Sequence, residues 1–274
     1  MNNIYVLGDI HGHYAPIRNL YSYLNSFYDK NIKPDESDVL ILLGDVGANF
    51  FFNERDIKFK KKLGTYKFTY FVIRGNHEQR PSLCAEQEPD KWDREQFFDN
   101  DVWVEKNFPY IKYAMDFPST YFINKRKVFV FPGAYSVDKY YRLANKWTWF
   151  EKEQLSEQEM ETGRRMINLQ NKKCDIVLSH TCPFCYEPTD LFMSGIDQSI
   201  VDKTMERYLG EIEWEIDYKL WFWGHFHSTR VYPTDEHKQP IMLYNDEAFD
   251  LKKYWDTLNP FDSLIKLHKE NNEI

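Results

Sequence analysis

The sequence has few cysteines, no long apolar run and no excess of positive charge, and each absence excludes a class of protein. Four cysteines among 274 residues do not form the disulfide framework of a small secreted domain. No apolar run approaches the roughly 20 residues of a bilayer-spanning helix, and the first residues lack the basic and apolar regions of a secretory signal. The formal net charge of −8 disfavours a general attraction to nucleic acid. We therefore expect a soluble cytoplasmic protein without a membrane partner.

The composition is that of a folded domain with a large core. Hydrophobic residues make up 42% of the chain and aromatic residues 18%, which argues against disorder. Neither repeats nor a linker divide the chain, so we expect one domain over residues 1–274. Within it, residues 81–118 are rich in proline, charge and aromatics, and we expect an inserted loop with short helices near the functional site. From about residue 255 we expect a peripheral tail.

Short apolar runs alternate with amphipathic stretches along the chain. The runs predict buried strands, and the longer stretches predict helices over 15–28 and 156–169, the second with a Ser156–Glu159 capping box. The predicted strands cover 4–7, 39–43, 68–73, 127–131, 175–178 and 218–223, with closing strands near 231–232 and 241–244. This alternation predicts an α/β fold with parallel strand pairing. Residues that follow such strands meet at one edge of the sheet.

Five polar clusters, several of them at the end of an apolar run, contain five of the eight histidines. In chain order they are Gly8-Asp9-Ile10-His11-Gly12, Gly44-Asp45-Val46-Gly47, Gly75-Asn76-His77-Glu78, Ser179-His180-Thr181 and Gly224-His225-Phe226-His227. They offer carboxylate, amide and imidazole groups together. Such mixed nitrogen and oxygen ligands favour Mn, Fe or Zn over Ca or Mg. Two metal ions held by such a set would support hydrolysis of a phosphate ester.

Individual positions suggest separate roles. A single carboxylate can bridge two cations, and we assign that role to Asp45. His77 directly follows the candidate ligand Asn76, so it is free to face the substrate and to protonate or stabilise the leaving oxygen. Arg74 is a candidate for holding a phosphate oxygen.

The five motifs together resemble the calcineurin-like metallophosphoesterase superfamily, whose pattern is D-x-H, G-D, G-N-H-[DE], H and G-H-x-H. The resemblance spans residues 8–227 in the right order. It implies two mixed β-sheets packed as a sandwich and flanked by helices. It also implies one metal on Asp9, His11, Asp45 and His227, a second on Asp45, Asn76, His180 and His225, and His77 as the catalytic histidine. Arg142, in a segment similar to bacterial relatives, is a second candidate for substrate binding, although an ion pair with Asp138 is the plainer expectation.

The second motif departs from the protein-phosphatase branch of that superfamily. Where that branch has G-D-x-V-D-R-G, this chain has Gly44-Asp45-Val46-Gly47-Ala48-Asn49. Ala48 replaces the supporting aspartate and Asn49 the phosphate-binding arginine. The resemblance therefore favours a bacterial-type or phage-type enzyme over a dedicated protein phosphatase.

The main hypothesis is a two-metal phosphoesterase acting on phosphomonoesters or phosphodiesters, with Mn as the favoured metal. A metal-bridging hydroxide would attack phosphorus while His77 assists the leaving group. The alternatives are a metal-binding scaffold without activity, a Ser/Thr protein phosphatase-like enzyme and a nuclease. The pair Cys182 and Cys185 has no second pair at zinc-site spacing, and reduced structural thiols are the simpler expectation.

Overall fold

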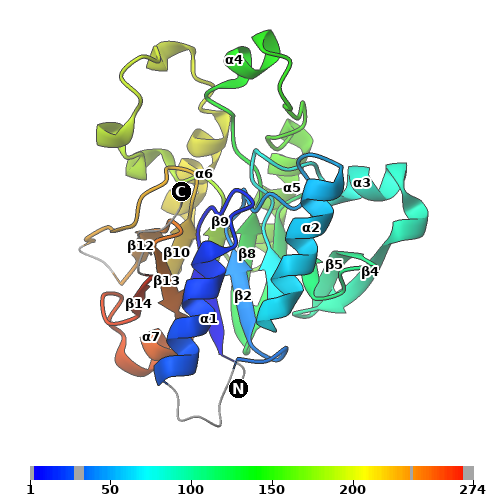
Figure 1. Ribbon diagram of the computed structural model, residues 1–274. Helices are drawn as coiled ribbons and strands as arrows, with labels where there is room; N and C mark the ends of the chain where they lie inside the picture. The colour runs from blue at the N-terminus through cyan, green and yellow to red at the C-terminus, as the bar shows by residue number, and fades with distance from the viewer. Residues whose placement is uncertain (1–2, 28–33, 235–236, 268–274) are drawn as a thin grey trace.

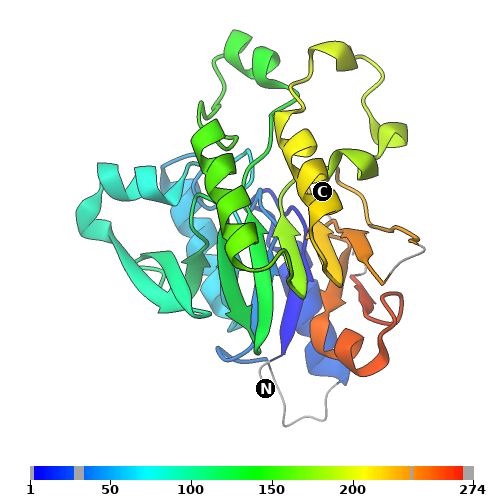
Figure 2. The same ribbon diagram turned by 180° about the vertical axis from the view of Figure 1, so that it is seen from behind.

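The computed structural model describes residues 3–27, 34–234 and 237–267, and the description below refers to these. The architecture has four layers, in which two mixed β-sheets pack face to face and helices cover both outer faces (Figures 1 and 2). This is the fold that the sequence predicts.

The larger sheet has eight strands. They are Ile4–Leu7 (β1), Val39–Leu42 (β2), Thr69–Val72 (β3), Trp92–Phe97 (β4), Asn100–Glu105 (β5), Ile111–Tyr113 (β6), Glu247–Asp250 (β13) and Leu264–Lys266 (β14). Their order is β14-β13-β1-β2-β3-β6-β5-β4. The pairs β1–β2 and β2–β3 are parallel, as the sequence predicts, and β3–β6 is parallel as well. Antiparallel strands complete both edges.

The smaller sheet has six strands. They are Ser119–Ile123 (β7), Arg126–Phe131 (β8), Ile176–Ser179 (β9), Leu220–Trp223 (β10), Arg230–Val231 (β11) and Gln239–Met242 (β12). Their order is β11-β12-β10-β9-β8-β7, with a parallel centre from β8 to β12 and antiparallel edges.

The helices lie on the outer faces and at the ends of the sheets. They are Ala15–Phe27 (α1), Glu54–Leu63 (α2), Pro81–Gln87 (α3), Lys139–Ala144 (α4), Glu157–Leu169 (α5), Thr204–Glu215 (α6) and Leu251–Thr257 (α7). The predicted capping box is present at the start of α5, where Ser156 and Glu159 bond each other's backbone N–H groups. Helices α1 and α2 cover the larger sheet, and α5 and α6 cover the smaller one (Figures 1 and 2).

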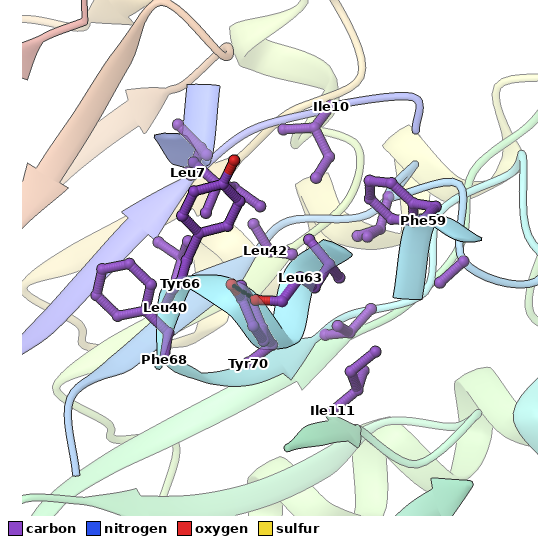
Figure 3. Packing of buried hydrophobic residues seen from close by; sticks show 14 of the residues in the cluster. Leu7, Ile10, Leu40, Leu42, Phe59, Leu63, Tyr66, Phe68, Tyr70 and Ile111 are labelled. Carbon is purple, nitrogen blue, oxygen red and sulfur yellow. Dashed lines mark hydrogen bonds between the residues drawn. The ribbon is translucent and has the colours of Figure 1, made fainter. Parts of the chain in front are cut away.

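Alternation along the strands explains the layers. In β1, Tyr5 and Leu7 belong to the outer core cluster under α1 and α2, while Ile4 and Val6 belong to the cluster between the sheets. All four are buried, because both faces of the strand are covered. Figure 3 shows the outer cluster, in which strand residues such as Leu40, Leu42 and Tyr70 meet Phe59 and Leu63 of α2.

Residues 81–118 differ from the expected loop with short helices. After α3 and a short 3₁₀ turn, they form β4, β5 and β6, which extend the larger sheet by three strands. The reason is pairing: β6 runs parallel to β3, so its backbone continues a ladder that begins in the core. The expected peripheral tail contains α7 and the edge strand β14, and residues 268–274 lie outside the described part.

Candidate metal centre

The five predicted motifs meet at one end of the two sheets. Asp9 follows β1, Asp45 follows β2 and Asn76 follows β3, all in the larger sheet. His180 follows β9 and His225 follows β10, both in the smaller sheet. Since these five strands are parallel within each sheet, their carboxyl ends bring the side chains together.

The backbone at the candidate ligands is strained. Four of them adopt left-handed conformations, with φ of 45° at His11, 50° at Asp45, 68° at His225 and 52° at His227. Residues with a side chain rarely adopt this conformation. Such strain persists where the surrounding fold fixes it, and it gathers at functional sites.

A first group of side chains consists of Asp9, His11 and His227. Their ligand atoms lie within 4.8 Å of one another. Nε2 of His11 and Nε2 of His227 are 2.9 Å apart, and Oδ2 of Asp9 lies 3.5 Å from Nε2 of His227. One carboxylate and two imidazoles therefore point at a common position.

A second group surrounds Asp45. Nε2 of His180 lies 3.4 Å from Oδ1 of Asp45 and 2.9 Å from Oδ1 of Asn76. The ring centroid of His225 is 5.1 Å from that of His180. Asp45 also forms a cluster with Asp9 and His180 within 4.8 Å, and another with His11 and His77. Asp45 thus lies between the two groups, where a bridging carboxylate would be needed, and His77 is itself within reach of a cation.

Hydrogen bonds fix the orientation of two of these side chains. Nδ1 of His180 lies 2.6 Å from the carbonyl oxygen of Leu43, so its N–H donates there and the Nε2 lone pair faces the centre. Nδ2 of Asn76 donates to Oγ of Ser136 at 3.0 Å, and that hydroxyl donates to Glu153. Asn76 therefore presents its oxygen to the centre. Ser136 and Glu153 lie outside the five motifs, and their role in orienting Asn76 was not predicted from the sequence.

The electrostatics of the centre favour a bound cation. Burial raises the pKa of Asp9; His180 opposes the rise and Asp45 adds to it, giving a value of about 7. Burial also disfavours the ionised form of Asp45. The nearby His180 and His77 side chains together have the larger effect and hold the pKa of Asp45 well below its usual range. Two buried carboxylates so close together are costly without a cation, and a dication removes that cost. The donor set thus fits the metal pair that the sequence suggests.

Two motif glycines allow the close approach of the carboxylates. A Cβ on Gly75 would lie 2.1 Å from Oδ1 of Asp45, and one on Gly224 would lie 2.0 Å from Oδ1 of Asp9. Both distances are far below van der Waals contact, so a side chain at either position would displace a candidate ligand.

The predicted catalytic histidine lies beside Arg142. Nε2 of His77 is 2.8 Å from Nη2 of Arg142 and 3.9 Å from Oδ2 of Asp45. Burial lowers the pKa of His77, Asp45 opposes this and Arg142 lowers it further. Nε of Arg142 also pairs with Oδ2 of Asp138 at 2.7 Å, as the spacing of the two residues predicts. Arg142 therefore faces the site while being held by Asp138.

Arg74 is not brought to the site. Its side chain is buried, its Nη1 donates to the carbonyl oxygen of Glu153 at 2.6 Å, and its Nε lies 3.6 Å from Asp116. The two residues by which the second motif differs from the protein-phosphatase pattern also lie in the interior. Ala48 and Asn49 are buried, and Oδ1 of Asn49 accepts a hydrogen bond from Lys60.

A cavity of about 300 Å³ opens beside the ligand groups. Asp45, Asn76, His77, His225 and His227 form its floor, and its walls come from residues 135–138 and 187–206. None of residues 81–118 is among the lining residues of this cavity. The residues that do form the cavity wall carry one signal in the sequence, the apolar run Leu191-Phe192-Met193 within a polar stretch.

Comparison with known proteins agrees with this geometry. Residues 3–229 match the model of the calcineurin-like phosphoesterase family, and no curated protein matches the sequence. The structure resembles TT1561 of Thermus thermophilus, with a TM-score of 0.53, 11% identity and coverage of 92% of this chain and 95% of that one. It also matches a phosphopantetheinyl hydrolase of Mycobacterium tuberculosis, with a TM-score of 0.47, 12% identity and coverage of 100% and 98%. At 11% identity, the likeness to TT1561 shows a shared fold and nothing about activity.

Proposed function

This chain belongs to the calcineurin-like phosphoesterase family, and on that premise we propose that it hydrolyses phosphate esters with two divalent metal ions. The observation that carries the proposal is the clustering of candidate ligands from five loops at one end of the two sheets, namely Asp9, His11, Asp45, His180 and His227, with Asn76 and His225 beside His180. Asp9, His11 and His227 would hold one ion, Asn76, His180 and His225 the other, and Asp45 would lie between them. Two such ions supply Lewis-acid stabilisation of phosphate charge and activation of water.

The chain's own residues would orient the ester and assist its cleavage. His77 lies on the cavity floor with its side chain about one-quarter exposed, so it can reach a bound ester. Its lowered pKa keeps the imidazole neutral near pH 7, and a neutral imidazole donates a hydrogen bond to the leaving oxygen. Arg142, 2.8 Å from His77, would place its guanidinium against a phosphate oxygen.

The proposal is tested by assaying phosphomonoesters and phosphodiesters, including p-nitrophenyl reporters, with Mn²⁺ and with metal content measured on the same sample. We expect turnover of at least one class. His77→Ala is expected to lower kcat by about 10²-fold or more while retaining metal, whereas Asp45→Ala is expected to lose both activity and metal. Fully metal-loaded protein that hydrolyses no ester in either class would refute the proposal.

A further inference from the structure

The cavity beside the ligand groups has several apolar residues in its walls. Leu191, Phe192 and Met193 line it from one segment and Phe226 from the loop of the fifth motif. Val137 and Val201 also line it. The rings of Phe192 and Phe226 are stacked with centroids 6.5 Å apart. The segment around residues 184–203 and α4 project beyond the sheets on either side of the site (Figure 1). The walls are therefore suited to covering an apolar group.

The charged residues of the cavity are already paired with protein groups. Lys203 is the only lysine or arginine among its described lining residues, and its Nζ lies 2.8 and 2.9 Å from the two carboxylate oxygens of Glu187. Oε1 of Glu206 accepts a hydrogen bond from Thr181 at 2.6 Å. Apart from the metal positions, the described lining therefore offers no unpaired cationic side chain that could bind a second phosphate or a carboxylate.

The position and volume of the cavity suit it to hold the leaving group of a substrate. His77, which would assist the leaving oxygen, lines the cavity together with Val137 and Asp138. A group bonded to that oxygen would extend into this cavity. A cavity of roughly 150 Å³ admits benzene, so about 300 Å³ has room for one ring and the phosphate that carries it.

We propose that this cavity binds the leaving alcohol of the substrate, and that this alcohol is uncharged and carries an aromatic or similar planar ring. The inference rests on the proposed phosphoesterase function and names its substrate class. Polyphosphates, phosphosugar acids and nucleic-acid strands are disfavoured, because their additional anionic groups would meet the carboxylates of Asp138 and Asp202 in the wall.

The test compares 2-phenylethyl phosphate with ethyl phosphate, each also as its methyl diester, because both are alkyl esters of similar intrinsic reactivity. We expect kcat/KM to favour the phenylethyl ester by about tenfold or more, as burial of one ring provides. Phe192→Ala should lower kcat/KM for the phenylethyl ester far more than for the ethyl ester, and so remove most of this preference. Leu169→Ala, an exposed position at the end of α5, is the matched control and should change neither. Equal values for the two esters, or equal losses on both in Phe192→Ala, would overturn the inference.

A second variant changes charge instead of shape. Glu187→Gln removes the counter-charge of Lys203, whose ammonium lies 4.4 Å from the centroid of the Phe192 ring in the wall. The ratio of kcat/KM for 4-carboxybenzyl phosphate to that for benzyl phosphate should then rise about threefold or more. An unchanged ratio in a folded variant would count against the placement of the ring in this cavity.

A binding measurement separates the two proposals. 2-Phenylethylphosphonate and ethylphosphonate cannot be hydrolysed, and their affinities for the metal-loaded protein are measured by calorimetry. Binding of the phenylethyl compound that is about tenfold tighter and is lost in Phe192→Ala supports the ring site even without turnover, in which case only the proposed function fails. Equal affinities overturn the ring site whatever the turnover.

Discussion

The backbone of Gly75 lies directly against the carboxylate of Asp45 in the ligand cluster. A methyl group on Gly75 would lie 2.1 Å from Oδ1 of Asp45. We therefore expect Gly75→Ala to weaken metal binding by at least about tenfold, because the candidate bridging carboxylate must move. Metal content after dialysis checks this. Gly195→Ala is the matched control, since a Cβ there meets nothing within 4 Å and metal binding should be unchanged.

Arg142 links the candidate catalytic histidine to the wall of the cavity. Its Nη2 contacts His77, and its Nε is held by Asp138. Arg142→Ala is expected to lower kcat/KM by about 10- to 100-fold through loss of phosphate contact, and Arg142→Lys should recover only part of it, because lysine lacks the planar fork. Steady-state kinetics on the best ester measure both. Arg165→Ala on the exposed face of α5 should be neutral. Full activity in Arg142→Ala would exclude contact with the phosphate.

Single residues show how far the sequence predicts the site. Asp9, Asp45 and His180 are predictable because each follows a buried strand within a recognisable motif. Arg74 directly precedes the third motif, yet its side chain turns to Glu153 and Asp116. Motif spacing fixes where the backbone goes but not which way a long side chain points. Ser136 and Glu153 act through contacts between segments distant from Asn76, which a linear pattern does not contain.

Helix α2 and strand β5 are joined by a buried ion pair. Nζ of Lys60 lies 2.5 Å from Oε2 of Glu105 and 2.8 Å from Oδ1 of Asn49, and both charged side chains are almost fully buried. Glu105→Ala leaves an ammonium buried without its counter-charge and is expected to cost about 3–5 kcal/mol of the free energy of unfolding. The double variant Lys60→Met, Glu105→Leu should recover most of this loss.

Urea unfolding of the metal-free protein measures these changes. Glu36→Ala removes an exposed ion pair with Lys67 and serves as the control, with an expected cost below about 1 kcal/mol. If Glu105→Ala costs no more than Glu36→Ala, the buried pair does not stabilise the contact between α2 and β5.

The elements differ in how well the sequence predicts them. β1, β2, β9 and β10 are apolar on both faces, so a short apolar run marks each one. β4 does not show this signal, because four of its six residues are exposed, and the prolines nearby favour a loop. Its pairing with β5 along six residues makes it a strand. Edge strands depend on a partner that composition does not reveal.

The stability of the whole molecule should depend on the ionisation of Glu206. Burial raises the pKa of this side chain to about 7, against an ordinary value of 4.5. A raised carboxyl pKa stabilises the fold below the unfolded value, and this contribution is lost as pH rises through 7. At about 1.4 kcal/mol per pKa unit, the free energy of unfolding should fall by about 3 kcal/mol between pH 4 and pH 8 from this group.

Glu206→Gln isolates that contribution, because glutamine does not ionise. The difference in unfolding free energy between the native protein and the variant should change by about 3 kcal/mol over the same pH range, in favour of the variant at high pH. Chemical denaturation at several pH values measures it. A difference that does not vary with pH would show that Glu206 ionises as it does in the unfolded chain.

Packing between the two sheets holds the halves of the sandwich together. All four cysteines are free, and three are buried, so no disulfide bond joins the sheets. The apolar side chains between the sheets form one buried cluster instead. Among the described helices, none is both long and apolar enough to span a bilayer.

The division of the ligands between the two sheets has a consequence for synthesis of the protein. Asp9, Asp45 and Asn76 emerge from the ribosome first, and His225 and His227 follow only after residues 77–224 have been translated. A nascent chain that has folded β1 to β3 would carry half a binding site and would hold metal weakly. We therefore expect the ions to enter after the second sheet has docked, as a late step of maturation and not as a nucleus for folding.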